Sequence, residues 1–172
     1  MLPKLILTDI DGVWTDGGMY YDNTGNELKK FNTYDSAGVL FCKLMDITFG
    51  IITGEKNKII ENRAKKLEVE YVFTGVRDKV KVVDDLLNKL GLTYDEVAYI
   101  GDDINDLELL KKVGISACPS GAPDYIKSEV DFIVSKKGGE GAFREFVEII
   151  LKEKGLLQEA LQRYFQQKKL NQ

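Results

Sequence analysis

Short apolar runs alternate with amphipathic stretches along this 172-residue chain, and no other feature limits its fold as strongly. The apolar runs have the length of buried strands and lie at 4–8, 48–53, 71–73, 97–101, 115–118 and 132–134. Two of the intervening stretches, 56–67 and 78–90, place apolar residues at helical spacing on one face. We therefore predict an α/β fold, a doubly wound parallel (Rossmann-like) sheet flanked by helices.

The first apolar run leads directly into two aspartates, Asp9 and Asp11, followed by Gly12. Residues two apart on a strand point to opposite faces, so both carboxylates can face one site only if the chain leaves the strand near Ile10. Gly12 gives the backbone the freedom to do so. Neighbouring carboxylates repel each other, so they share a cation or divide into an ionised base and a protonated acid. We predict a charged site at this strand end, where doubly wound folds bind ligands.

The composition restricts the chemistry and the partners of such a site. The chain has no histidine, so proton transfer near neutral pH falls to carboxylates, lysine, tyrosine or cysteine. A net charge of −4 argues against binding of nucleic acid. Two cysteines in apolar surroundings, no signal-peptide pattern and no long apolar run predict buried thiols, no membrane partner and a cytoplasmic location.

Two segments stand outside the alternation of strands and helices. Residues 18–32 have the pattern of a β-hairpin with Asn and Gly in its turn. The apolar side chains of this hairpin suit either a contact between subunits or packing on the same domain, and the sequence leaves both open. Residues 155–172 have the pattern of a terminal helix, so we predict one domain over 1–154 and a C-terminal helical tail.

Four elements follow one another along the chain: Asp9-Ile10-Asp11-Gly12, Thr53-Gly54, Lys79 and the string from Gly101 to Asp106. In this order and spacing they resemble the four motifs of the haloacid dehalogenase-like phosphohydrolases. The resemblance implies that Asp9 attacks phosphorus and forms an aspartyl-phosphate. It also implies that Asp11 protonates the leaving oxygen and then activates water.

The same resemblance implies the other parts of a phosphoryl-transfer site. Mg²⁺ would be held by the Asp9 carboxylate, the Asp11 backbone carbonyl and the Asp102 carboxylate, since oxygen ligands suit a hard cation. The phosphate would be bound by Thr53, the Gly54 amide and Lys79, and supported by Asp103 and Asp106. Two structural alternatives stay open, because Thr53 suits the N-cap of a helix and Asp106 suits the cap of the helix that follows it.

Further features resemble one branch of this family, the capless phosphatases of 3-deoxy-octulosonate and nonulosonate phosphates. The chain has room for a hairpin but not for a cap domain, and it carries a glycine-rich string over 138–141. That string fits a mobile segment that folds over a site. In this family the hairpins pair around a tetramer and neighbouring subunits close each active site, so the resemblance implies a homotetramer.

The substrate expected from this resemblance is a phosphorylated sugar acid. The octulosonate 8-phosphate branch usually has an arginine where Glu55 stands, so the departure favours a nonulosonate 9-phosphate, of the 2-keto-3-deoxynonulosonate or N-acetylneuraminate type. Glu55 would accept hydrogen bonds from sugar hydroxyls, and Lys66 would meet the sugar-acid carboxylate. The octulosonate 8-phosphate is the alternative substrate, and a phospho-receiver or a silent assembly protein is the alternative outside enzymes.

Overall fold

The computed structural model describes residues 2–170 and contains a six-stranded parallel sheet with the strand order β5-β4-β1-β6-β7-β8. Its strands are β1 (Leu5–Thr8), β4 (Thr48–Ile52), β5 (Tyr71–Phe73), β6 (Val97–Ile100), β7 (Ile115–Pro119) and β8 (Phe132–Val134). Each matches an apolar run of the sequence to within one residue at either end. The predicted doubly wound fold is confirmed.

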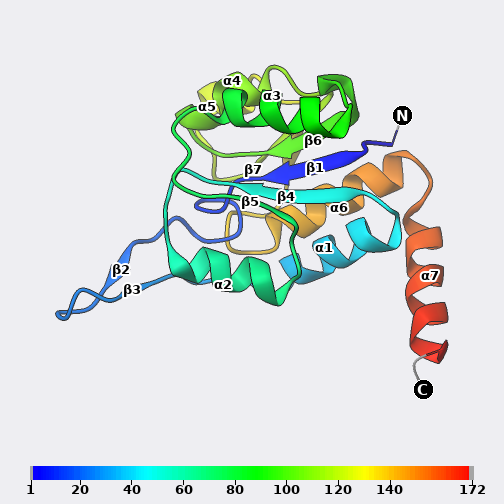
Figure 1. The fold of residues 1–172 in the computed structure, drawn as a ribbon, viewed down its shortest axis with the longest axis horizontal. Coiled ribbons are helices and arrows are strands. Elements are labelled where there is room, and N and C mark those ends of the chain that lie inside the picture. The colour runs from blue at the N-terminus through cyan, green and yellow to red at the C-terminus, as the bar shows by residue number, and fades with distance from the viewer. Residues whose placement is uncertain (1, 171–172) are drawn as a thin grey trace.

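Helices cover both faces of the sheet (Figure 1). One face carries α1 (Asp35–Leu44), α2 (Lys58–Lys66) and α6 (Ala142–Glu153), and the other carries α3 (Lys79–Leu90), α4 (Leu107–Leu110) and α5 (Asp124–Lys127). Two short 3₁₀ turns, η1 (Tyr94–Glu96) and η2 (Ile104–Asp106), flank β6. Side chains of β1 alternate between the two apolar cores, with Ile6 in one and Leu5 and Leu7 in the other.

The order of the strands determines where a ligand can bind. The chain adds β4 and β5 on one side of β1, then returns and adds β6, β7 and β8 on the other side. The direction therefore reverses at β1, and a crevice forms outside the carboxyl ends of the strands that flank the reversal. The candidate residues that follow β1, β4 and β6 all lie at this edge of the sheet.

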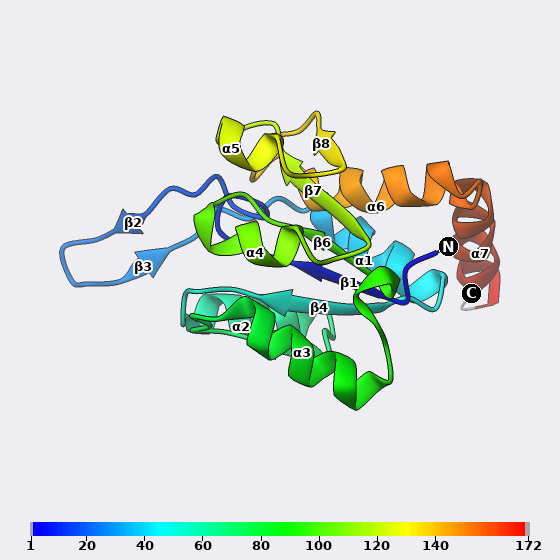
Figure 2. The ribbon, with the colours of Figure 1, turned by 90° about the horizontal axis from the view of Figure 1, so that it is seen from above.

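The hairpin and the C-terminal helix lie at opposite ends of the molecule (Figures 1 and 2). Strands β2 (Tyr20–Tyr21) and β3 (Glu27–Leu28) project beyond the carboxyl ends of the sheet strands. Helix α7 (Leu157–Leu170) packs on α1 and α6 at the other end, where Arg163 Nη1 donates to the Leu44 carbonyl at 2.7 Å. The tail is therefore docked, while positions 171–172 lie outside the described residues and the division at residue 154 stays a prediction.

Two expected absences concern residues 2–170. Between β1 and α1 the chain forms the hairpin and short turns, so this part of the chain holds no cap domain. None of the helices described there combines the length and the apolar character needed to cross a membrane.

Candidate active site

A pocket of about 260 Å³ opens where the carboxyl ends of β1, β4 and β6 meet. Its walls are formed by Asp9, Asp11, Gly12, Gly17, Thr53, Gly54, Glu55, Asp102, Asp103 and Asn105. Most of the site residues expected from the sequence therefore line one cavity. The exceptions are Lys79 and Asp106, which lie behind its wall, and Lys66, which lies elsewhere.

The turn after β1 brings the acidic motif into the pocket. The strand ends at Thr8, and the Asp9 amide donates to the Ile100 carbonyl of β6 at 3.0 Å. Gly12 has a φ of +79°, a conformation that side chains other than glycine rarely adopt. A Cβ atom at Gly12 would also lie 1.8 Å from Asp102 Oδ2. The glycine therefore permits both the turn and the close approach of the Asp102 carboxylate.

Lys79 binds two carboxylates behind the pocket. Its Nζ atom lies 3.0 Å from Asp9 Oδ2 and 2.5 Å from Asp106 Oδ1, and its side chain is only 1% exposed. Lys79 begins α3, where the helix dipole disfavours a positive charge, and these two anions offset that cost. Its contact with phosphate stays a prediction, because the ammonium group points to Asp9 from behind the wall of the cavity.

Asp106 organises the loop that carries Asp102. Its Oδ2 atom accepts hydrogen bonds from the amides of Asp102 and Asp103, at 2.9 and 3.1 Å. Its Oδ1 atom accepts from Lys79 and from the Tyr99 hydroxyl. The side chain makes no capping bond to α4, but its hydrogen bond from the Asp103 amide forms part of a capping box at η2, the 3₁₀ turn that leads into α4.

Thr53 lies at the end of β4 with its side chain buried in the pocket wall. Its Oγ1 atom accepts a long hydrogen bond from the Glu55 amide, at 3.4 Å. The N-cap of α2 is Asn57, whose side chain accepts from the Ile59 amide at 2.8 Å. The N-cap alternative for Thr53 is therefore wrong, and its hydroxyl is available to donate into the pocket.

The carboxylates of Asp9, Asp102 and Asp106 form a cluster in which one oxygen of each lies within 4.8 Å of the others. Burial and the charge of Asp106 raise the pKa of Asp9 to about 7, although Lys79 opposes the rise. Burial and the charge of Asp9 raise the pKa of Asp102 to about 8. Lys79 alone does not balance the three carboxylates, so the cluster favours a second cation.

The donor set of this cluster fits a hard divalent cation. The buried Asp102 Oδ1 atom has no hydrogen-bond partner among the described residues. Asp106 already accepts from Lys79, Tyr99 and two amides, so Asp9 and Asp102 are the carboxylates that remain for a metal ion. Carboxylate oxygens are the ligands that Mg²⁺ prefers in proteins.

Lys29, a residue that the sequence analysis did not select, contacts the acidic motif from the base of the hairpin. Its Nζ atom donates to Asp11 Oδ1 at 2.7 Å and lies 3.3 Å from Glu27 Oε1. Burial acts to lower the pKa of Lys29, but the contacts with Asp11 and Glu27 outweigh it and raise the pKa, so the side chain stays charged. The sequence gives one indication of this contact, the position of Lys29 two residues after Glu27 in the predicted hairpin.

Lys66 does not reach the pocket of its own chain. It is exposed and ends α2, a helix whose first residue is Lys58. Nine helical residues span roughly 12 Å along the axis. Glu55, by contrast, precedes α2 and lines the pocket. Glu55 therefore lines the pocket and Lys66 lies outside its walls, and the substrate contacts of both residues stay predictions.

The glycine-rich string was expected to fold over a site, and the structure corrects that expectation. Gly138 and Gly139 pack against the turn that follows Asp11, and the Gly139 amide donates to the Val13 carbonyl at 3.1 Å. The Asn32 side-chain amide donates to the Gly139 carbonyl at 3.0 Å. The string supports the turn from behind and contributes nothing to the pocket walls.

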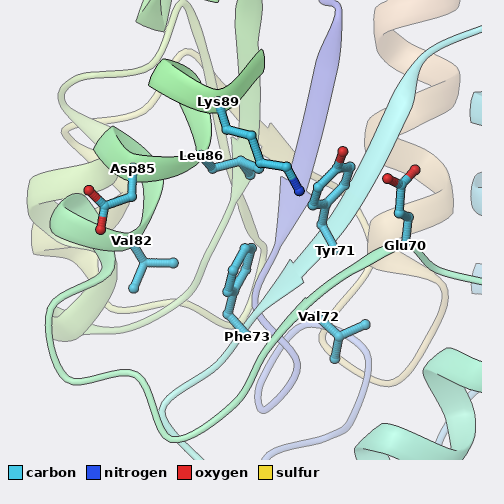
Figure 3. A pocket seen from close by; sticks show the side chains of 8 residues that line it. All are labelled: Glu70, Tyr71, Val72, Phe73, Val82, Asp85, Leu86 and Lys89. Carbon is cyan, nitrogen blue, oxygen red and sulfur yellow. The ribbon is translucent and has the colours of Figure 1, made fainter.

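A larger groove, of about 440 Å³, lies between β5 and α3 at the edge of the sheet (Figure 3). Its ionisable side chains do not converge, since the carboxylates of Glu70 and Asp85 lie on opposite sides of the groove in Figure 3. Lys89 lies over the ring of Tyr71, with its Nζ atom 5.1 Å from the ring centroid. The chemistry is therefore concentrated in the smaller, acidic pocket.

Known proteins are similar to this chain in sequence and in fold. A sequence profile of the haloacid dehalogenase-like hydrolases matches residues 43–145. The 3-deoxy-D-manno-octulosonate 8-phosphate phosphatase of Escherichia coli strain K12 is 38% identical over 157 residues, which cover 91% of this chain and 84% of that protein.

Two solved structures are also similar. The enzyme of that name from Yersinia pestis has a TM-score of 0.87 at 36% identity, covering 91% of this chain and 84% of the other. The Moraxella catarrhalis enzyme, in complex with magnesium, phosphate and KDO, has a TM-score of 0.85 at 35% identity, covering 87% and 86%. This chain therefore belongs to the haloacid dehalogenase-like hydrolase family and is a phosphoric monoester hydrolase of its capless branch.

Proposed function

We propose that this enzyme hydrolyses the phosphate monoester of a 2-keto-3-deoxy sugar acid and that the reaction passes through an aspartyl-phosphate on Asp9. The observation that carries the proposal is the buried Asp9 carboxylate at the floor of the pocket, with Lys79 behind it and Asp102 beside it. Membership of a hydrolase family sets aside the phospho-receiver and the assembly-protein alternatives.

The residues divide the work of a double displacement. Asp9 attacks phosphorus while the bond to the sugar oxygen breaks, and Asp11 gives that oxygen its proton. Asp11 then takes a proton from the water that cleaves the aspartyl-phosphate, and this step frees phosphate and restores Asp9. The Thr53 hydroxyl, the Gly54 amide and Lys79 stabilise the phosphoryl oxygens on which negative charge develops.

The metal ion proposed for this site is Mg²⁺. Asp9, the Asp11 carbonyl and Asp102 would hold it, in keeping with the unpartnered Asp102 Oδ1 atom and with the magnesium in the Moraxella catarrhalis relative. When bound, the ion neutralises charge on the phosphoryl oxygens. Asp103 and Asp106 would keep the Asp102 loop in position.

Two observations favour different sugar acids. Glu55 lines the pocket where the octulosonate 8-phosphate branch usually has an arginine, and this supports the nonulosonate 9-phosphate. The names of the similar proteins support the octulosonate 8-phosphate instead. We propose the nonulosonate 9-phosphate as the substrate. The position of Glu55 is an observation on the pocket of this chain, whereas the names describe other proteins.

The assembly proposed is a homotetramer built on the hairpins. The hairpin projects from the body and exposes apolar side chains, those of Met19, Tyr20, Tyr21 and Leu28. A neighbouring subunit placed there would stand over the pocket, and this is how Lys66 of another copy could reach a substrate. The alternative of a hairpin packed on its own domain applies to the residues that contact the body, Glu27, Lys29 and Asn32.

The test compares kcat/KM for the two sugar-acid phosphates in Mg²⁺, with Asp9→Asn as the blank. We expect the 9-phosphate to be preferred, and we expect Glu55→Arg to move the preference toward the 8-phosphate. Lys56→Ala, a change at the exposed neighbouring residue, is the matched control. Preference for the 8-phosphate in the unchanged enzyme would show that Glu55 does not select the substrate. Activity remaining in Asp9→Asn would contradict the proposed nucleophile.

A further inference from the structure

We propose that Lys29 is a positioning residue for the acid–base step, which holds the Asp11 carboxylate by Oδ1 so that Oδ2 faces the leaving oxygen of the substrate. This inference rests on the proposed function, in which Asp11 donates the proton to that oxygen. Lys29 itself touches neither the phosphate nor the sugar, and it acts through Asp11.

The two oxygens of Asp11 have different surroundings. Oδ1 accepts a hydrogen bond from Lys29 Nζ at 2.7 Å and another from Thr15 Oγ1 at 3.1 Å. Oδ2 is buried and has no hydrogen-bond partner among the described residues. A buried polar oxygen without a partner is costly, so such an atom in a pocket is best explained by a group that binds there. The Asp11 carboxylate is thus fixed on one side and open on the other.

Lys29 is itself held in a defined position. Its side chain is 1% exposed, and its Nζ atom lies 3.3 Å from Glu27 Oε1 as well as against Asp11. Glu27 in turn accepts a hydrogen bond from the side chain of Asn57, the N-cap of α2. A chain of polar contacts therefore connects the start of α2, through the base of the hairpin, to Asp11. Such supporting contacts keep a reacting group within the narrow range of positions that catalysis requires.

Two substrates with different leaving groups distinguish a positioning role of Lys29 from a general structural role. A sugar alkoxide is a strong base and needs a proton as it leaves, whereas p-nitrophenolate leaves without one. A misplaced acid therefore slows transfer from a sugar phosphate much more than transfer from p-nitrophenyl phosphate. The readout is the ratio of the two kcat/KM values, because kcat/KM includes only the steps up to transfer of the phosphoryl group to Asp9.

We expect Lys29→Met to lower this ratio by about 10- to 100-fold, part of the effect that a general acid supplies. Lys29→Arg keeps the charge and should recover most of the ratio. Lys30→Met is the matched control, because Lys30 is the next residue, is 70% exposed and lies 3.7 Å from Asp16. If Lys29→Met shows no cooperative unfolding transition in urea, Lys29→Gln takes its place with the same expectation.

The possible outcomes are distinct. Equal losses on both substrates would overturn the inference and make Lys29 a structural residue or a determinant of phosphate binding. An unchanged ratio would overturn it as well. Failure of the proposed function would show differently, as a lack of Asp9-dependent hydrolysis of the sugar phosphate by the unchanged enzyme.

Discussion

At the scale of single residues, the buried charges around Lys79 account for much of the site. Within residues 2–170, Lys79 is the one cation that contacts both Asp9 and Asp106, and all three side chains are nearly inaccessible to solvent. Removing one partner of a buried ion pair leaves a charge without compensation, which costs about 3–5 kcal/mol. We expect Lys79→Met to lower the free energy of unfolding by about this amount, measured with urea in EDTA.

A variant of Asp106 tests whether the loss of stability in Lys79→Met comes from the buried charges. Asp106→Asn removes one of the two negative charges that face Lys79. Combined with Lys79→Met, it should cost less than the sum of the two single changes, because neighbours that share an interaction are not additive. Additive losses would mean that Lys79 stabilises the fold through the packing of its alkyl chain.

The raised pKa values of Asp9 and Asp102 predict how the metal-free protein responds to pH. Below the pKa of an unfolded aspartate, about 4, both states hold these protons and the stability that they contribute is complete. It is lost as the pH rises toward the folded pKa values of about 7 and about 8, because the native state keeps protons that the unfolded chain releases. The free energy of unfolding in EDTA should therefore fall over this range.

Mg²⁺ supplies the control for the pH effect. The ion favours the ionised carboxylates, so it should raise the unfolding temperature more at about pH 8 than at about pH 5. An equal rise at both pH values would show that Asp9 and Asp102 do not bind the ion. Asp102→Asn should remove most of the rise.

At the scale of elements, the contact between the glycine-rich string and the acidic turn predicts a specific loss. A Cβ atom at Gly138 would lie 2.0 Å from the Gly12 carbonyl oxygen, which is backbone and cannot move alone. We expect Gly138→Ala to displace the turn that carries Asp11 and to lower kcat/KM by about 100-fold or more, a loss typical of misplaced catalytic groups. Gly121→Ala is the matched control, since its Cβ atom would meet only Lys137 Cγ at 3.9 Å. Equal activity of the two variants would contradict this role of the string.

The strands of the sheet were predictable because each is a short apolar run with polar residues after it, whereas α1 was not predicted. Helix α1 carries Gly38 in its middle, and an interior glycine weakens a helical pattern. The structure explains the glycine, since a Cβ atom there would lie 2.7 Å from Phe143 Cε1 of α6. Helices α4 and α5 have four residues each, too few for a periodic pattern.

The residues of the site also divide into those that the sequence predicts and those that it does not. Asp9, Thr53 and Asp102 were predictable because each lies within two residues of the end of a strand, and the sheet brings parallel strand ends together. Lys29 and Tyr99 were missed for different reasons. Lys29 reaches Asp11 through the fold of the hairpin, and Tyr99 lies inside the apolar strand β6, where its hydroxyl group gives no pattern.

At the scale of the whole molecule, the pocket and the hairpin lie at the same edge of the sheet, where the strands have their carboxyl ends. The two strands of the hairpin have two residues each, and an isolated two-stranded ribbon is marginal in water. Its exposed apolar side chains therefore favour burial against another copy of the chain. Helix α7 lies at the end of the molecule opposite the hairpin (Figure 2).

We therefore predict that both the oligomeric state and the phosphatase activity depend on the hairpin. Leu28 is 64% exposed, and Leu28→Glu places a charge on the surface proposed to be buried between subunits. We expect this variant to sediment as a smaller species at micromolar concentration and to lose activity toward the sugar-acid phosphate. Phe165→Glu is the matched control, because Phe165 is 58% exposed on α7 and should leave the assembly unchanged. A fully active Leu28→Glu monomer would show that each pocket works without a neighbour, so that Lys66 has no part in binding the substrate.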